Sequence, residues 1–281
     1  MKVLLLQDAG VHEKNKHLRE CITLQKGFRN IGSHCDIWGR DHSHCDINIL
    51  PDFDSYDLII DLWEAYHSRL NLSKVKTKKF LFSCDAHVNG EQTYIDIMNQ
   101  GGFDAILTNA QGLFTDVESY WIKPLIDPDF IKRKNRDKKS FLGFCGNRNP
   151  QRNEYIDKLT DEFNLHQDIF VIGDDMVNAI NSYEIHFNKN LGYPHGFAYR
   201  IAETLACGSV LLTNESYMNE MVGLKDKQNC LIYTDYDDIK DKLNWVLEDR
   251  EKRVKKLSDA GYELRHQFST TETAKKILEV L

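Results

Sequence analysis

Short apolar segments alternate with longer segments of helical periodicity along the whole chain, and this alternation most constrains the fold. Parallel strands need long crossover connections, which helices usually supply, so the pattern is typical of parallel sheets covered by helices on both faces. We therefore predict an α/β protein. The expected strands are 2–7, 34–38, 56–61, 79–83, 104–108, 140–145, 169–172, 183–188, 209–213 and 230–233, and the expected helices include 13–31, 150–163, 197–207 and most of 235–281.

The alternation breaks once, at the polar connector 127–139, and then restarts. Asn149 followed by Pro150 marks a helix start, because Asn caps a helix well and Pro fits its first position. We predict two Rossmann-like parallel-sheet domains, residues 1–126 and 140–281, with the last helix free to pack back on the first domain. Such domains bind ligands at the carboxyl ends of their strands, so we expect the domains to face each other across a ligand cleft.

Composition excludes several classes of protein. The chain has 281 residues, of which 41% are hydrophobic and 28% charged, as in ordinary globular proteins. No apolar run approaches the roughly 20 residues needed to span a bilayer, and the first residues lack the features of a signal peptide. The seven cysteines form no CxxC pair, which fits reduced thiols. We therefore expect a cytoplasmic protein without stable membrane insertion.

The net charge of −7 argues against a broadly basic surface that coats nucleic acid. Two basic clusters run against this trend: residues 132–139, and the lysines at 74, 76, 78 and 79. Charge runs are usually solvated. A contact with an anionic acceptor or with DNA is the alternative interpretation.

Metal binding is the weaker interpretation of two further patterns. Potential zinc ligands lie close together at Cys35, His42, His44 and Cys45, but their spacing fits no common zinc module. Asp-x-Asp occurs at 52–54, 127–129 and 235–237, in stretches where Asp is a common turn former. We expect no metal site.

The segment 192–208 carries the most information about function. A helix that begins near Gly196 places Phe197, Ile201 and Leu205 on one face, and Tyr199, Arg200 and Glu203 on another. The first N–H groups of such a helix can bind a phosphate, and a carboxylate further along can bind ribose hydroxyls. The alternative is an amphipathic helix with a surface Arg–Glu pair.

Residues 200–208 read Arg-x-x-Glu-x-Leu-Ala-Cys-Gly, which resembles the signature of CgeB-like GT-B glycosyltransferases. The resemblance covers most of 140–281 well and 1–139 weakly. It implies the two-domain GT-B fold and an enzyme that moves a sugar from a nucleoside diphosphate sugar to an acceptor hydroxyl. It further implies retention of anomeric configuration, with no metal and no cofactor.

The resemblance also implies roles for individual residues. Glu203 would bind the ribose, Arg200 would contact phosphate or brace Glu203, and the loop near Gly146 would face the donor phosphates. His195 stands where many retaining members carry a glutamate that touches the donor sugar, so the identity of that sugar stays open. The expected donor-binding residues are Gly146, Asn147, Arg152, His195, Gly196, Phe197, Arg200 and Glu203.

Candidates in the amino-terminal half follow two predicted strands. Asp85 and His87 come after strand 79–83, and with Arg200 they are the candidate catalytic residues. The alternative for Asp85 and His87 is a purely local pair. Gly10 and His12 follow the first strand and resemble the first loop of GT-B enzymes, so we expect them on the acceptor side.

The acceptor itself stays open. Two domains of this size leave little room for insertions, which favours a bulky or polymeric acceptor such as a polysaccharide or a protein. Transfer to a hydroxymethylated base of DNA is one alternative. A non-catalytic protein that binds nucleotide sugars is the other.

Overall fold

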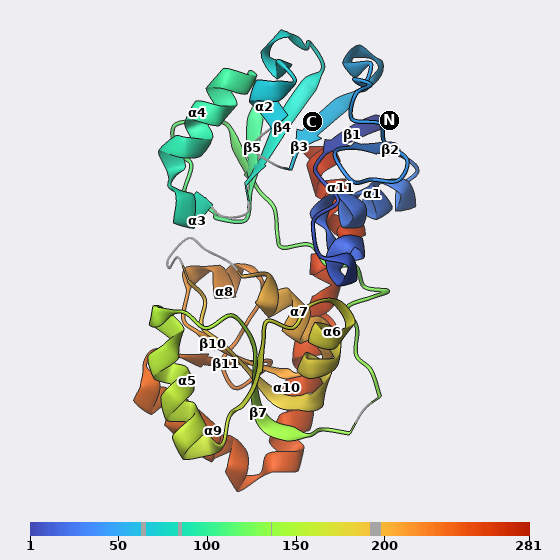
Figure 1. Cartoon of the computed structure of the whole chain (residues 1–281). Helices are drawn as coiled ribbons and strands as arrows, with labels where there is room; N and C mark the ends of the chain where they lie inside the picture. Colours follow the sequence, from blue (N-terminus) through green and yellow to red (C-terminus); the bar gives the residue numbers. More distant parts are fainter. Residues whose placement is uncertain (63–65, 84–85, 136, 192–197) are drawn as a thin grey trace. The chain divides into compact units, whose positions relative to one another are not determined.

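The computed structural model describes residues 1–62, 66–83, 86–135, 137–191 and 198–281, without the side chains of 67, 68, 87 and 88. The chain forms two compact units (Figure 1). Unit 1 is Met1–Asp127 with Gln267–Leu281, and unit 2 is Pro128–His266. Each unit contains one parallel sheet with helices, which confirms the predicted α/β class. Residues 267–281 belong to unit 1, although the sequence analysis included them in the second domain, 140–281.

The sheet of unit 1 has the order β2-β1-β3-β4-β5-β6, and every neighbouring pair is parallel. Its strands are β1 (Lys2–Leu6), β2 (His34–Trp38), β3 (Leu58–Asp61), β4 (Lys78–Ser83), β5 (Ala105–Thr108) and β6 (Ser119–Trp121). Its helices are α1 (Glu20–Asn30), α2 (Tyr66–Arg69), α3 (Ala86–Asn89), α4 (Glu91–Gly101) and α11 (Thr270–Glu279), with 3-10 turns η1 (Glu13–Leu18), η2 (Phe53–Ser55) and η3 (Leu72–Lys74). The single predicted helix 13–31 is therefore wrong, because Arg19 has extended backbone (ψ 144°) and separates η1 from α1.

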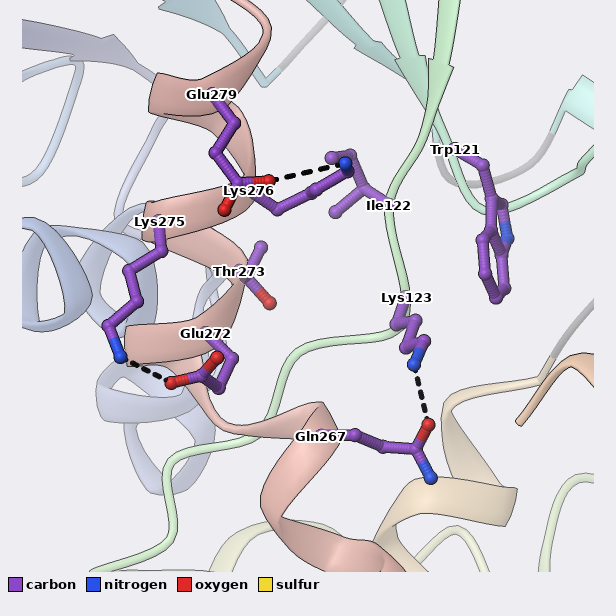
Figure 2. A pocket seen from close by; sticks show the side chains of 9 residues that line it. All are labelled: Trp121, Ile122, Lys123, Gln267, Glu272, Thr273, Lys275, Lys276 and Glu279. Carbon is purple, nitrogen blue, oxygen red and sulfur yellow. Dashed lines mark hydrogen bonds and ion pairs between the residues drawn. The ribbon is translucent and has the colours of Figure 1, made fainter. Parts of the chain in front are cut away.

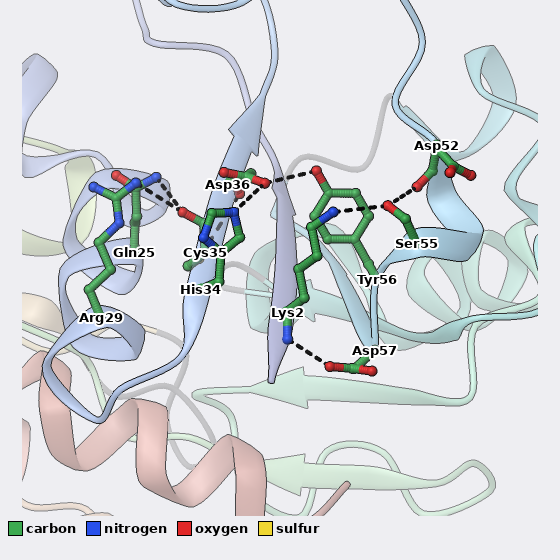
Figure 3. Close-up of polar contacts among 10 residues, drawn as sticks. All are labelled: Lys2, Gln25, Arg29, His34, Cys35, Asp36, Asp52, Ser55, Tyr56 and Asp57. Atoms are coloured by element: carbon green, nitrogen blue, oxygen red, sulfur yellow. Dashed lines mark hydrogen bonds and ion pairs between the residues drawn. The ribbon is translucent and has the colours of Figure 1, made fainter.

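Polar contacts fix the amino ends of the central strands (Figure 3). The backbone N–H of Lys2 donates to Asp57 Oδ2 at 2.7 Å, and its Nζ donates to Ser55 Oγ at 3.1 Å. The Tyr56 hydroxyl donates to Asp36 Oδ2 at 2.9 Å, which links the segment before β3 to β2. This edge is therefore occupied by structural contacts. The opposite edge, at the carboxyl ends of the strands, is where parallel sheets bind ligands.

The carboxyl-terminal segment completes unit 1. Helix α11, drawn in red in Figure 1, packs against α1, drawn in blue. Gly27 makes this approach possible, because a Cβ there would lie 2.3 Å from the backbone oxygen of Thr270. The Thr270 hydroxyl donates to the Thr23 carbonyl, and Ile126 forms a parallel bridge with Ser269.

The sheet of unit 2 has the order β11-β10-β9-β7-β8 and is also parallel. Its strands are β7 (Ser140–Gly146), β8 (His166–Ile169), β9 (Tyr183–Asn188), β10 (Val210–Asn214) and β11 (Leu231–Tyr233). Its helices are α5 (Pro150–Phe163), α6 (Gly173–Ser182), α7 (Tyr199–Cys207), α8 (Tyr217–Met221), α9 (Tyr236–Glu248) and α10 (Arg250–Glu263), and the turn η4 (Leu264–Phe268) leads into unit 1. The strands contribute to the buried apolar core of this unit, with the side chains of Leu142, Ile185, Phe187, Val210, Leu212 and Leu231.

Two local predictions in unit 2 have opposite outcomes. The predicted helix start is confirmed, because the Asn149 side chain accepts from the backbone N–H of Arg152 at 3.0 Å and Pro150 opens α5. The predicted strand 169–172 is wrong, because β8 ends at Ile169. Phe170, the next residue, has φ +59° and is 76% exposed. It therefore leaves the extended conformation of a strand, although it is apolar.

Within the described residues, no helix combines the length and the apolar character that crossing a membrane requires.

Candidate functional site

Arg200 and Glu203 form an ion pair on α7, the helix that follows β9 in unit 2. Arg200 Nη1 lies 2.9 Å from Glu203 Oε2, and the two side chains are only 22% and 13% exposed. On the opposite face, Ile201 and Leu205 are fully buried. The structure thus confirms the predicted faces for Ile201 and Leu205 and for Arg200 and Glu203, whereas Phe197 lies outside the described residues. The helix begins at Tyr199, later than predicted, because Ala198 has extended backbone.

The ion pair keeps Arg200 charged although it is largely enclosed. Burial by itself lowers the pKa of Arg200, but the Glu203 carboxylate together with Cys145, Cys207 and Tyr183 outweighs it, and the pKa is raised overall. Glu203 Oε2 is buried and has no hydrogen-bond partner among the described residues, so its contact with Arg200 has ion-pair distance without hydrogen-bond geometry. A carboxylate oxygen in this state can still accept a hydrogen bond from a ligand hydroxyl.

His186, in the middle of β9, positions the start of α7. Its Nε2 accepts from the backbone N–H of Cys145 at 3.2 Å, so the proton lies on Nδ1, 2.7 Å from Thr204 Oγ1. The Thr204 hydroxyl in turn donates to the Arg200 carbonyl at 2.6 Å. Burial, together with the charge of Arg200, holds the pKa of His186 well below its ordinary value. The chain of bonds therefore runs from β7 through a neutral imidazole to α7.

Sequence reasoning assigned no role to His186 or Thr204. A signal was present: His186 lies between the apolar residues Ile185 and Phe187, and Thr204 precedes Leu205 on α7. Both polar side chains are completely buried. Buried polar groups are almost always hydrogen-bonded, so such residues mark a network.

Arg152, on the first turn of α5, is a second cation at the same sheet edge. Its Nε donates to the carbonyl of Lys189 and its Nη1 to that of Asn147, both at 3.2 Å. Burial lowers its pKa, and the positive charge of Arg200 lowers it further. Among the described residues, no carboxylate lies within ion-pair distance of Arg152. Glu203 pairs with Arg200 alone, so the two guanidinium groups together carry an excess of positive charge.

The residues of the loop after β7 do not all face the same way. Asn147 is exposed and its carbonyl helps to hold Arg152. Arg148 turns to α5, where it forms an ion pair with Asp157 and donates to Asn153 Oδ1 at 3.1 Å. Gly146 ends β7, and a Cβ there would lie 3.3 Å from the ring of Phe144. The structure thus gathers Gly146, Asn147, Arg152, Arg200 and Glu203 around the carboxyl ends of β7 and β9.

Several predicted site residues lie outside the described part of the chain: Asp85, His195, Gly196 and Phe197. His87 falls in α3, but its side chain is also outside that part.

Gly10 and His12 lie together in unit 1, in a pocket of about 390 Å³ at the carboxyl end of β1. Gly10 has φ +85°, a backbone conformation that favours glycine. Arg40 donates to both oxygens of Asp8, through its backbone N–H at 2.8 Å and through its guanidinium at 2.7 Å and 3.0 Å. Burial raises the pKa of Asp8, but hydrogen bonds from Arg40 and Tyr66 lower it more, so Asp8 remains a carboxylate. The pocket is thus polar and charged on one wall.

The basic run 132–139 is largely engaged within unit 2. Arg133 forms an ion pair with Asp259 at 2.9 Å and stacks on Tyr262, and Lys134 bonds Asn178 at 2.9 Å. Lys138 donates to the carbonyls of residues 181 and 183. The run therefore tethers the chain to its own helices.

The second basic cluster lies at the amino end of β4 in unit 1, at the edge opposite the expected ligand edge. Lys79 is buried and donates to the Val75 carbonyl at 2.6 Å, and burial lowers its pKa. Lys74, Lys76 and Lys78 are exposed.

The residues weighed as zinc ligands serve other contacts. Cys35 is completely buried, and His42 Nε2 lies 2.8 Å from the Gln7 carbonyl. Across the parts of the chain that the structure covers, no three His, Cys, Asp or Glu side chains are grouped to hold a metal ion.

Comparison with known proteins places this arrangement in a wider context. The model of the glycosyl transferase-like family matches residues 139–279. No curated protein matches the sequence. Anabaena HepE in complex with UDP-glucose aligns over 100% of this chain and 99% of its own, with a TM-score of 0.70 and 12% identity.

Two further glucosyltransferases have similar structures. T4 phage BGT in complex with UDP-glucose aligns over 99% of each chain, with a TM-score of 0.68 and 12% identity. An α-glucosyltransferase in complex with UDP and a 13-mer DNA aligns over 100% of this chain and 99% of its own, with a TM-score of 0.72 and 11% identity. At these identities the likeness concerns the fold.

Proposed function

The chain belongs to the glycosyl transferase-like family and is a glycosyltransferase with the GT-B fold, and from this premise we propose that it transfers a sugar from a UDP-sugar to an acceptor hydroxyl. UDP is the nucleotide because HepE, T4 phage BGT and the α-glucosyltransferase all bind it. Within the family we assign the chain to the CgeB-like branch, on the signature at 200–208. The thiols described by the structure are free, which supports a cytoplasmic location.

One observation carries this proposal: two arginines and one glutamate converge at the carboxyl ends of β7 and β9. The excess positive charge of Arg152 and Arg200 suits a diphosphate, since guanidinium groups bind phosphate oxygens with strong, charge-assisted hydrogen bonds. Glu203 lies one helical turn from Arg200 and offers a carboxylate to the ribose hydroxyls. His195, Gly196 and Phe197 complete the donor site in this proposal.

The chemistry follows from charge stabilisation. As the bond between the sugar and the diphosphate breaks, negative charge grows on the phosphate, and fixed cations at that point lower the barrier. Arg152 and Arg200 supply those cations in unit 2, so the reaction needs no metal. We propose retention, with the departing phosphate accepting the proton of the acceptor hydroxyl. His186 cannot serve as the base there, because both of its nitrogens are engaged.

The acceptor binds unit 1 in this proposal, at the pocket that holds Gly10 and His12. Asp85 and His87 contact the reacting sugar or the acceptor from the segment after β4. The carboxylate of Asp8 and the guanidinium of Arg40 line the same pocket and can orient hydroxyl groups. A polysaccharide or a protein with an exposed hydroxyl fits this chemistry.

DNA is the second candidate acceptor, favoured by the likeness to T4 phage BGT, a DNA-modifying enzyme, and to an α-glucosyltransferase in complex with DNA. The basic run 132–139 gives it little support, because Arg133, Lys134 and Lys138 bind groups of the protein itself. Salt-dependent binding of a DNA duplex would favour this candidate. Transfer of the sugar to an oligosaccharide, without salt-dependent binding of DNA, would favour a polysaccharide acceptor.

The test is a screen of nucleotides and nucleotide sugars by thermal shift, followed by an assay of hydrolysis and transfer with the donor that binds. We expect UDP and at least one UDP-sugar to raise the melting temperature. Glu203→Gln should weaken the binding of UDP about tenfold or more, since a lost hydrogen bond to a charged group is worth roughly 1.5–3 kcal/mol. The control is Glu154→Gln, on the exposed face of α5.

Absence of binding by every nucleotide diphosphate contradicts the proposal. Binding of UDP-sugars with neither hydrolysis nor transfer to any acceptor supports the non-catalytic alternative instead.

A further inference from the structure

A second pocket, of about 480 Å³, lies wholly within unit 1 (Figure 2). One wall is the chain from the end of β6 to Lys123, and the other is α11 together with Gln267. Its volume falls within the range of small-molecule sites, roughly 300–1,000 Å³. None of its residues belongs to the donor site in unit 2.

The lysines of this pocket differ in their partners. Lys275 pairs with Glu272 at 2.6 Å, and Lys276 pairs with Glu279 at 3.3 Å, both along α11. Lys123 has no carboxylate within ion-pair distance among the described residues. Its Nζ donates to the amide oxygen of Gln267 at 2.5 Å.

The environment of Lys123 is costly for an ammonium group without a counter-ion. The residue is partly buried, and burial lowers its pKa with no carboxylate to oppose the effect. An ammonium has three hydrogens, and Gln267 accepts one of them. Partly buried charges are normally paired, so this cation is suited to an anion that enters the pocket from solution.

Trp121 adds an aromatic surface beside the cation. The Lys123 ammonium lies 5.7 Å from the centre of the indole ring, and the ring lines the same pocket (Figure 2). The indole N–H is buried and has no hydrogen-bond partner in the described structure. A ligand with a flat or ring-shaped body can pack on the indole while its anionic end meets Lys123.

We propose that this pocket binds a small phosphate monoester that carries a ring, such as a sugar phosphate. Lysine binds phosphate as a point charge, and the apolar face of a sugar ring packs against aromatic side chains. The pocket also joins the two places where the chain leaves unit 1: Lys123 precedes the connection at 127–128, and Gln267 follows the one at 266–267. A bound ligand braces both segments.

The test is isothermal titration calorimetry on the full chain, with glucose 6-phosphate, inorganic phosphate and glucose as probes, in the presence of saturating UDP. We expect glucose 6-phosphate to bind, inorganic phosphate to bind more weakly, and glucose not to bind. Lys123→Gln should weaken glucose 6-phosphate at least tenfold. Lys275→Gln removes the same charge from the same pocket, at a lysine with a carboxylate partner, and should change the affinity less than threefold.

Trp121→Phe retains a ring and removes the N–H, so it reports whether the indole donor contributes to binding beyond the ring. Equal losses in Lys123→Gln and Lys275→Gln would overturn the proposal, as would no binding of glucose 6-phosphate at millimolar concentration in the presence of saturating UDP. A loss of UDP binding in Glu203→Gln has no bearing on these outcomes. The two proposals therefore fail independently.

Discussion

Single residues with no direct part in the chemistry hold the proposed donor site in place, and His186 is the clearest case. It is fully buried, neutral and bonded at both nitrogens, and it connects β7 to the backbone of Arg200 through Thr204. Placing a proton on this imidazole would remove the acceptor that the Cys145 N–H needs. The geometry of the site therefore depends on a group that must remain uncharged.

This dependence predicts a pH effect on stability. In the unfolded chain His186 takes up a proton as the pH falls below about 6.5, whereas the folded form, with its lowered pKa, does not. The unfolded state then binds more protons, so the free energy of unfolding falls as the pH drops, by up to about 1.4 kcal/mol per pH unit.

Denaturant unfolding at pH 7.5, 6.5 and 5.5 measures this slope. His186→Gln retains an acceptor and a donor but removes the titration, so its slope below pH 6.5 should be shallower than that of the wild type. His166→Gln, at a side chain 54% exposed, is the control and should keep the wild-type slope. Parallel curves for the wild type and His186→Gln would exclude this role.

At the scale of elements, the end of α7 explains the glycine in the 200–208 signature. Gly208 has φ +70° and closes the helix, and a Cβ there would lie 2.1 Å from Nε of Arg133. Arg133 passes over this glycine to reach Ser258 and Asp259 on α10. The signature glycine is therefore required both by the backbone conformation and by a side chain from the connector.

Gly208→Ala should lower the free energy of unfolding by about 1–3 kcal/mol, through backbone strain and crowding. Arg133→Ala removes the side chain that the new methyl group would meet. The double variant should thus lose less than the sum of the single losses, as measured by chemical denaturation of all four proteins. Strictly additive losses would show that Arg133 does not occupy the space above residue 208.

The elements also show where sequence reasoning works. Strands 34–38 and 183–188 were predicted with their observed bounds, because short segments of alternating polar and apolar residues flanked by turn residues specify a strand locally. The faces of α7 followed from helical spacing for the same reason. β6 was missed, since its three residues are all partly exposed and become a strand only by pairing with β5. β8 was misplaced because its first three residues are polar while residues 170–172, which follow it, are apolar.

The candidate site likewise contains residues that the local sequence predicts and residues that it does not. Arg200 and Glu203 were predictable, because their spacing on one helix and the family signature are both local in sequence. The network of His186, Thr204 and Cys145 was not, since it joins a strand to a helix and to a neighbouring strand. The pocket of Lys123 and Gln267 was also beyond prediction, because its walls are more than a hundred residues apart in the chain.

At the scale of the whole molecule, the last residues of the chain complete the first unit. Gly27→Ala places a methyl group against the backbone of Thr270, which cannot yield as a flexible side chain can. We expect α11 to be displaced from α1, with a loss of about 1–3 kcal/mol in the free energy of unfolding.

Trypsin should then cleave Gly27→Ala faster than the wild type after Lys275 and Lys276. In the control Thr271→Ala, which removes an exposed hydrogen bond to Asn30, cleavage should stay at the wild-type rate. Unchanged cleavage of Gly27→Ala would contradict the packing of α11 on α1.

The central claim is that the excess positive charge at the carboxyl edge of unit 2 binds the diphosphate of the donor. Isothermal titration calorimetry with UDP and with uridine tests it most directly, because the two ligands differ in the diphosphate alone. Arg152→Gln should weaken UDP at least tenfold and leave uridine unchanged, whereas Glu203→Gln should weaken both. Arg148→Gln, at an arginine already paired with Asp157, should bind UDP as the wild type does. UDP binding by Arg152→Gln at the wild-type affinity, or an equal loss in Arg148→Gln, would contradict the claim.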